Sequence, residues 1–360
     1  MQTKNILDQN SFSKKDIMSL LSLDTDMQRD ALYKKAYEIK KHYVGTVVYF
    51  RGLIELSNIC AKNCLYCGIR AGNTKIKRYE MSIEETLNAV DFAWKSHYGS
   101  VVIQSGELSS PEFVDKIDLI LKKIKENTNG EIGVTLSCGE QTRETYKRWF
   151  ANGARRYLLR IETSNKDLYY KIHPHDEHHC FENRIKALKD LKEIGYQTGS
   201  GIMVGLPFQT IENIADDILF LRDLDIDMIG LGPYIEHSET PLYKEKDSLI
   251  PKIKRFELAL KTIAILRIIM KDINLASATA LQAIDPEGRE KALIVGANII
   301  MPNITPTEYR DDYLLYEDKP CTGENAAQCK GCLEGRVAKY GETIGYDQWG
   351  DSKHFDKRKK

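Results

Sequence analysis

The chain has 360 residues, of which 42% are hydrophobic and 29% are charged, with only 10 prolines. This composition excludes a disordered or collagen-like protein and provides enough apolar side chains for the core of one large α/β barrel. Lysine plus arginine and aspartate plus glutamate each total 52, so the formal net charge is zero, which argues against nucleic acid as a partner.

Strand-like and helix-like segments alternate along most of the chain. Residues 1–45 are predicted to form a helical extension, 46–303 a barrel, and 304–360 a capping segment that contains cysteines. The alternation favours a parallel sheet, and eight strand–helix units favour an α/β fold closed into a (βα)8 TIM barrel, with an open doubly wound sheet as the alternative. The predicted strands are 46–56, 100–104, 132–137, 157–161, 198–204, 228–234, 275–281 and 298–301. The predicted helices are 82–96, 111–126, 181–194, 211–224 and 252–270.

Polar or small residues follow the carboxyl ends of most of these strands. In a barrel the carboxyl ends of the strands form one face, and that face carries the chemistry. We therefore expect an active site there, built from residues 104–107, 137–140, 160–163, 199–201, 277–279 and 302–303.

Three cysteines, Cys60, Cys64 and Cys67, follow the first predicted strand with the spacing C-x3-C-x2-C. Three thiolates on one loop can bind a cubane iron–sulfur cluster and leave its fourth iron open to a substrate or cofactor. A zinc loop with a distant fourth ligand, or plain buried cysteines, are the alternatives, although zinc loops favour C-x2-C pairs.

This loop is similar to the signature of the radical S-adenosylmethionine family. The resemblance implies a [4Fe–4S] cluster whose open iron binds S-adenosyl-L-methionine, and cleavage of that cofactor to a 5′-deoxyadenosyl radical. Residues 105–107 resemble the Gly-Gly-Glu element that holds the methionyl amino group, with Ser105 in place of its first glycine. The implied cofactor-binding residues are Tyr66 beside the adenine, Gln104, Ser105, Gly106 and Glu107 at the amino group, Arg184 at the methionyl carboxylate, and Glu162 and Met203.

Longer strings resemble the HydE-type hydrogenase maturases within that family. They lie at 63–68, 104–107, 157–163, 203–207, 288–289, 296–298, 301–303 and 305–306. The resemblance implies action on a small iron–carbonyl–cyanide species carrying cysteine, during assembly of the diiron subcluster of the hydrogenase H-cluster. The implied partners are other hydrogenase maturation proteins and a reductant such as ferredoxin or flavodoxin. A mutase acting on an amino acid such as lysine, like methylornithine synthase, and a non-enzymatic iron–sulfur scaffold are the alternatives.

Residues of the fourth predicted strand indicate an anion-binding cavity. Arg160 and Glu162 are two positions apart, so they are expected to face the same side, where a buried pair must compensate its charges. By resemblance, Arg160 faces the substrate and Glu162 the S-adenosylmethionine. The other residues predicted for the substrate cavity are Thr135, Ser137, Thr279 and, closing it from the tail, Tyr309.

A second cysteine cluster, Cys321, Cys329 and Cys332, predicts an accessory metal site that could hold zinc, a [2Fe–2S] or a [4Fe–4S] cluster. It resembles the accessory site of some HydE-type proteins, and no catalytic role is assigned to it.

The other cysteine-bearing features are not assigned to catalysis. The segment 173–180 contains four of the eight histidines and a cysteine, and it is interpreted as a solvated loop rather than a zinc site. Cys138 is expected to be a small buried side chain.

The N-terminus lacks the apolar core of a signal peptide, and no apolar run is long enough to cross a bilayer, so a cytoplasmic protein with reduced thiols is expected.

Overall fold

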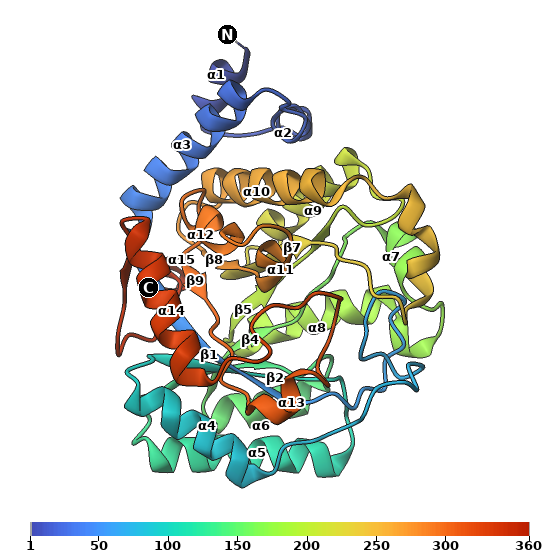
Figure 1. Cartoon of the computed structure of the whole chain (residues 1–360), viewed down its shortest axis with the longest axis vertical. Coiled ribbons are helices and arrows are strands. Elements are labelled where there is room, and N and C mark those ends of the chain that lie inside the picture. Colours follow the sequence, from blue (N-terminus) through green and yellow to red (C-terminus); the bar gives the residue numbers. More distant parts are fainter. Residues whose placement is uncertain (1, 360) are drawn as a thin grey trace.

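The computed structural model describes residues 2–359, and their centre is a closed parallel barrel (Figure 1). Each strand pairs in parallel with the next along the barrel, and β1 pairs with β9 through Tyr49 and Ile299, which closes the ring. This closure confirms the (βα)8 expectation and excludes the open sheet. The barrel strands are β1 (Val47–Ser57), β2 (Ser100–Ser105), β3 (Gly133–Ser137), β4 (Ala154–Leu158), β5 (Gln197–Ser200), β7 (Met228–Pro233), β8 (Asn274–Ser277) and β9 (Ile299–Ile300).

Amphipathic helices surround the barrel, and the predicted ones form where their periodicity placed them. The helix after β1 begins with a capping box in which Ser82 and Glu85 satisfy each other's backbone N–H groups. The helices that follow the strands are α4 (Ile83–Lys95), α5 (Pro111–Asn127), α6 (Arg143–Ala151), α7 (Lys166–Ile172), α8 (Phe181–Ile194), α9 (Ile211–Asp223), α10 (Lys252–Ile269), α11 (Thr279–Ile284) and α12 (Gly288–Leu293). Short 3-10 turns occupy η1 (Glu177–His179) and η2 (Pro241–Ser248).

Three strand predictions were wrong in their bounds. Strand β4 begins at Ala154 rather than Tyr157, because the arginine at 156 is buried and bonded inside the fold rather than exposed. The predicted strand 275–281 ends at Ser277, and its remainder forms α11. The predicted strand 198–204 is interrupted, since β5 is followed by the separate two-residue strand β6 (Met203–Val204).

Three helices precede the barrel and pack on its outer layer, at the top of Figure 1. The longest of them, α3 (Asp26–Tyr43), contacts α10. Helix α2 (Lys14–Leu21) packs on α9 and α10, and α1 (Gln2–Leu7) packs on α3 and α2. A fully buried ion pair between Lys40 Nζ and Glu342 Oε2, 2.6 Å apart, joins α3 to the C-terminal segment. Within residues 2–359, no helix has both the length and the apolar character required for a membrane span.

The C-terminal segment returns to the amino-terminal end of the barrel and plugs it. Arg51 Nη2 donates to the Gly350 carbonyl at 2.9 Å, and Arg156 Nη1 lies 2.5 Å from the Asp351 carboxylate. The sequence analysis did not predict this plug, because its contacts join residues 299 and 195 positions apart in the chain. The C-terminal segment as a whole contains α13 (Thr307–Arg310), α14 (Ala326–Lys339), the two-residue strand β10 (Thr343–Ile344) beside β1, and α15 (Lys353–Arg358).

His354 fastens this plug and makes its contribution to stability depend on pH. Its Nε2 lies 2.7 Å from Asp225 Oδ1 and its Nδ1 3.2 Å from Asp272 Oδ1, and the Asp272 hydrogen bond, aided by Asp225, raises the pKa of His354. A raised pKa means that the folded state holds the proton more tightly, so this stabilisation is complete below about pH 6.5 and is lost as the pH rises through the folded pKa.

We therefore expect His354→Gln to lower the free energy of unfolding by up to about 1 kcal/mol at about pH 6, and by less at about pH 9. Urea denaturation of both proteins at the two pH values measures this difference. An equal loss at both pH values would contradict the assignment.

Candidate active site

A cavity of about 240 Å³ opens at the carboxyl ends of the barrel strands, where the strand-end residues were expected to meet. Seven of the residues predicted for the site line it together with the cluster cysteine Cys67. They are Tyr66, Gln104, Ser137, Arg160, Glu162, Met203 and Thr279. The far wall comes from the C-terminal segment through Leu315, Tyr316 and Lys319.

The cysteine loop, defined here as residues 58–68, follows β1 without helix or strand structure and carries three free thiols, of which Cys67 lines the cavity. The backbone N–H of Glu107 donates to Cys60 Sγ at 3.3 Å, so the chain after β2 already supports one thiol. Burial, followed by the neighbouring Cys67 and Cys60 sulfurs, raises the pKa of Cys64, and burial raises that of Cys67 to about 12. These protonated thiols become ligands only when a metal displaces their protons.

The donor set of this loop fits an iron–sulfur cluster. Soft thiol ligands select iron–sulfur clusters, zinc or copper(I). Within residues 2–359, no three His, Cys, Asp or Glu side chains converge on one point that could hold a single metal ion. The thiols of a cubane bind different irons and need not converge in this way.

Gly106 allows the chain after β2 to lie directly against the cysteine loop. A side chain at this position would overlap the Ile59 carbonyl and come within 2.9 Å of Cys60 Cβ. The neighbouring Ser105 hydroxyl donates to the Gly106 carbonyl at 2.7 Å. A residue without a side chain is therefore required where the loop and the end of β2 meet.

A buried cluster of two cations and two anions stands beside the loop. Glu107 accepts from Lys62 Nζ at 2.9 Å and from Arg184 Nη2 at 3.4 Å, and Glu140 lies 2.5 Å from Arg184 Nε and 3.3 Å from Lys62 Nζ. Burial lowers the pKa of Arg184, but Glu107 and Glu140 outweigh burial and raise it well above its usual range. The structure therefore brings the predicted Glu107 and Arg184 together. Glu140 was expected at this face as part of residues 137–140 but was given no role of its own, and Lys62, which lies between the cysteines of the loop, was not predicted.

Arg160 and Glu162 form a second charged pair, on the cavity wall. Arg160 Nε and Nη2 donate to the two Glu162 carboxylate oxygens at 2.7 and 2.8 Å, and Nη1 donates to the Gly230 carbonyl at 3.0 Å. The prediction that the two side chains face the same side is confirmed, but strand alternation is not the cause. Both residues lie beyond the end of β4, and Glu162 has a left-handed backbone with φ of 65°.

A third pair, between Glu55 and Lys319, was not predicted. Lys319 Nζ lies 2.6 Å from Glu55 Oε1 and donates to the Tyr313 carbonyl at 2.8 Å, while Asn303 Nδ2 donates to Glu55 Oε2 at 3.1 Å. This pair holds the C-terminal segment over the cavity, and Gln104 Nε2 adds a bond to the Tyr313 hydroxyl. The presence of Glu55 within the apolar strand β1 was the sequence feature that could have indicated a buried ion pair.

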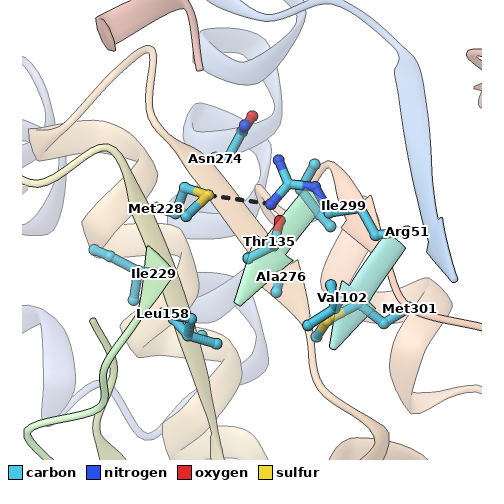
Figure 2. A pocket seen from close by; sticks show the side chains of 11 residues that line it. Arg51, Val102, Thr135, Leu158, Met228, Ile229, Asn274, Ala276, Ile299 and Met301 are labelled. Carbon is cyan, nitrogen blue, oxygen red and sulfur yellow. Dashed lines mark hydrogen bonds between the residues drawn. The ribbon is translucent and has the colours of Figure 1, made fainter. Parts of the chain in front are cut away.

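Two residues predicted for the substrate cavity lie elsewhere. Thr135 lines a separate cavity of about 30 Å³ deeper in the barrel, where Arg51 donates to Met228 Sδ at 3.1 Å (Figure 2). The Thr135 hydroxyl accepts from Arg156 Nε there. Tyr309 does not line the main cavity, since its ring stacks on Tyr79 and its hydroxyl donates to Glu85 at 2.6 Å.

The cysteines of the C-terminal cluster lie between α13 and the middle of α14. Cys329 is buried and Cys332 exposed on α14, and Cys321 precedes that helix in a left-handed conformation. Arg289 Nη2 and Gln282 Nε2 donate to Cys321 Sγ at 3.7 and 3.8 Å. Elsewhere, Cys138 is fully buried, as expected.

The fold and the cysteine loop together define a radical S-adenosylmethionine protein, and a model of the Radical SAM superfamily matches residues 54–221. The chain is 44% identical over 348 residues to the [FeFe] hydrogenase maturase subunit HydE of Thermotoga maritima, covering 96% of each protein. The chain therefore belongs to the radical S-adenosylmethionine superfamily and, within it, to the HydE family.

More distant relatives share the same barrel. The chain is 27% identical over 309 residues to 3-methylornithine synthase of Methanosarcina acetivorans, covering 85% of this chain and 83% of that protein. The crystal structure of methylornithine synthase superposes with a TM-score of 0.80 at 22% identity, covering 96% of this chain and 98% of that chain. At that identity the superposition shows a common fold.

Proposed function

We propose that this radical S-adenosylmethionine enzyme acts in assembly of the diiron subcluster of the [FeFe]-hydrogenase H-cluster. The observation that carries the proposal is the 44% identity to a HydE maturase subunit over nearly the whole of both chains. The cavity beside three free thiols supports it, because a radical reaction requires its cofactor and substrate in one secluded space.

The cofactor site is proposed on the loop and on the strand ends beside it. When bound, a [4Fe–4S] cluster and S-adenosyl-L-methionine supply one-electron cleavage to a 5′-deoxyadenosyl radical. Cys60, Cys64 and Cys67 would hold the cluster, and Glu107 and Arg184 would bind the methionyl amino and carboxylate groups through charge-assisted hydrogen bonds. Tyr66, Gln104, Ser105, Gly106, Glu162 and Met203 complete the proposed cofactor-binding set.

The substrate proposed for the cavity is a small iron–carbonyl–cyanide species that carries cysteine. Arg160 stands on the cavity wall, and the hydroxyls of Ser137 and Thr279 add neutral hydrogen-bonding groups. A cation on the wall of a cavity favours an anionic ligand. The volume of about 240 Å³ suits a small molecule rather than a polymer.

Three further features belong to the same proposal. Other hydrogenase maturation proteins would deliver or receive the organometallic species, and a ferredoxin or flavodoxin would supply the electron. Cys321, Cys329 and Cys332 would bind an accessory iron–sulfur cluster of the [2Fe–2S] or [4Fe–4S] type, without a catalytic role. The free state of all cysteines within residues 2–359 suits the reducing cytoplasm.

Activation of an [FeFe]-hydrogenase tests the proposal. The anaerobically reconstituted chain, added to the other maturation proteins and apo-hydrogenase, is expected to yield hydrogen evolution that is absent when the chain is omitted. A parallel incubation with lysine is expected to give no rearranged amino acid. A lysine-derived product without hydrogenase activation would instead support a mutase like 3-methylornithine synthase.

A further inference from the structure

The histidine-rich segment 173–180 packs against the cysteine loop through two of its four histidines. His173 and His179 are buried, whereas His175 and His178 are exposed. The four imidazoles therefore do not share one environment. The two buried rings each make a hydrogen bond to the loop.

His179 accepts a hydrogen bond from the backbone of the loop. The Asn63 N–H donates to its Nε2 at 3.0 Å, and its Nδ1 lies 2.6 Å from Asp176 Oδ1. A backbone N–H can only donate and a carboxylate can only accept, so the ring must be neutral with its proton on Nδ1. Burial lowers the pKa of His179, which favours this neutral form.

His173 makes the equivalent contact on the other side of Cys64. Its Nδ1 lies 2.9 Å from the Tyr169 carbonyl and must donate to it, so its Nε2 accepts from the Tyr66 hydroxyl at 3.2 Å. The ring stacks on Tyr169 with centroids 4.0 Å apart, and burial lowers its pKa to about 3. His173 is therefore fixed in one tautomer and one orientation.

The backbone of the segment adds two more contacts to the same stretch of loop. The Leu65 N–H donates to the Ile172 carbonyl at 3.0 Å, and Lys62 Nζ donates to the His178 carbonyl. Residues 62–66 thus donate four hydrogen bonds to residues 172–179. The loop has no helix or strand of its own, so contacts of this kind determine how far it opens.

We propose that His173 and His179 form a histidine clasp, a pair of positioning residues that hold the cysteine loop on both sides of Cys64. The inference rests on the proposed function insofar as the loop is taken to bind the cluster. Without the clasp, the Asn63 N–H and the half-buried Tyr66 hydroxyl lose their acceptors, and the thiols are no longer held at fixed spacing. The clasp slows loss of iron from the loop and does not itself bind metal.

Amide hydrogen exchange of the full-length protein, before and after anaerobic reconstitution, tests the clasp. The variant His173→Phe/His179→Ala is expected to exchange the amides of residues 63–66 about five to ten times faster than the wild type, as for the loss of one or two hydrogen bonds. Release of iron to a chelator should accelerate by a similar factor. The matched control, His175→Ala/His178→Ala, should leave both rates unchanged.

Two additional outcomes make the test specific. His179→Gln offers a carbonyl oxygen in place of Nε2 and is expected to restore most of the protection at Asn63. Equal rates in the clasp and control variants would overturn the proposal, and so would faster exchange spread equally over β1 and β7, which indicates general destabilisation. Hydrogen exchange before reconstitution needs neither iron nor S-adenosylmethionine, so it tests the clasp alone. A negative exchange result would leave the proposed function intact. A failure of the proposed function would appear only in the hydrogenase assay.

Discussion

Cys64→Ala is expected to abolish cleavage of S-adenosylmethionine by the reconstituted protein. Cys64 is the central thiol of the cysteine loop, with Cys60 and Cys67 on either side. Removal of one thiol leaves a second iron of a cubane without a protein ligand. Loss of a neighbour that only supports a metal ligand already costs about 10- to 100-fold, so loss of the ligand itself should lower 5′-deoxyadenosine yield by more than about 100-fold.

Cys180→Ala provides the matched control. Cys180 is also a free, partly exposed thiol, but it lies in the histidine-rich segment and contacts Glu182. Its replacement should leave iron content and 5′-deoxyadenosine yield unchanged when both are measured after anaerobic reconstitution and reduction. A full yield from Cys64→Ala would show that the cluster, if any, is held elsewhere.

Arg160→Met is expected to lower both stability and activity. The substitution removes the two hydrogen bonds to the buried Glu162 carboxylate and leaves that charge unpaired. Breaking a buried pair on one side costs about 3–5 kcal/mol, and partial exposure of Arg160 places the expected loss nearer about 2–4 kcal/mol. Removal of this cation from the cavity wall should also reduce product formation by at least about tenfold, or 1.4 kcal/mol of transition-state binding.

Arg155→Met separates these effects from the loss of a positive charge alone. Arg155 precedes the same strand end but is exposed. Urea denaturation and product yield of this variant should match the wild type. If Arg160→Met and Arg155→Met behave alike in both measurements, the pair with Glu162 has no role in the site.

The fold was predictable where the hydrophobic pattern is periodic and local. Helices α4 and α5 and the alternation of strands and helices follow from apolar spacing, and that alternation in turn predicts the barrel. The earlier start of β4 was not predictable from the hydrophobic pattern, because Arg156 is a charged residue at a fully buried position of the strand. Its burial depends on Asp351 and Thr135, which are distant in the sequence.

The candidate site divides in the same way. The cysteine spacing and the strand-end residues are local features, and the cavity lies where they indicated. The pair of Glu55 with Lys319 and the bonds of His173 and His179 to the cysteine loop join segments far apart in the chain. Nothing in their own neighbourhoods specifies these partners, so the histidine-rich segment was interpreted as a solvated loop although two of its rings are buried.

The most direct test of the proposed chemistry is the electron paramagnetic resonance spectrum of the reduced cluster with and without S-adenosylmethionine. Addition of the cofactor should change the spectrum, because its amino and carboxylate groups would occupy the open iron left by three cysteine ligands. The Cys321→Ala/Cys332→Ala variant, which lacks two of the three ligands proposed for the C-terminal cluster, should retain this change. An unchanged spectrum would contradict the assignment and support an iron–sulfur scaffold instead.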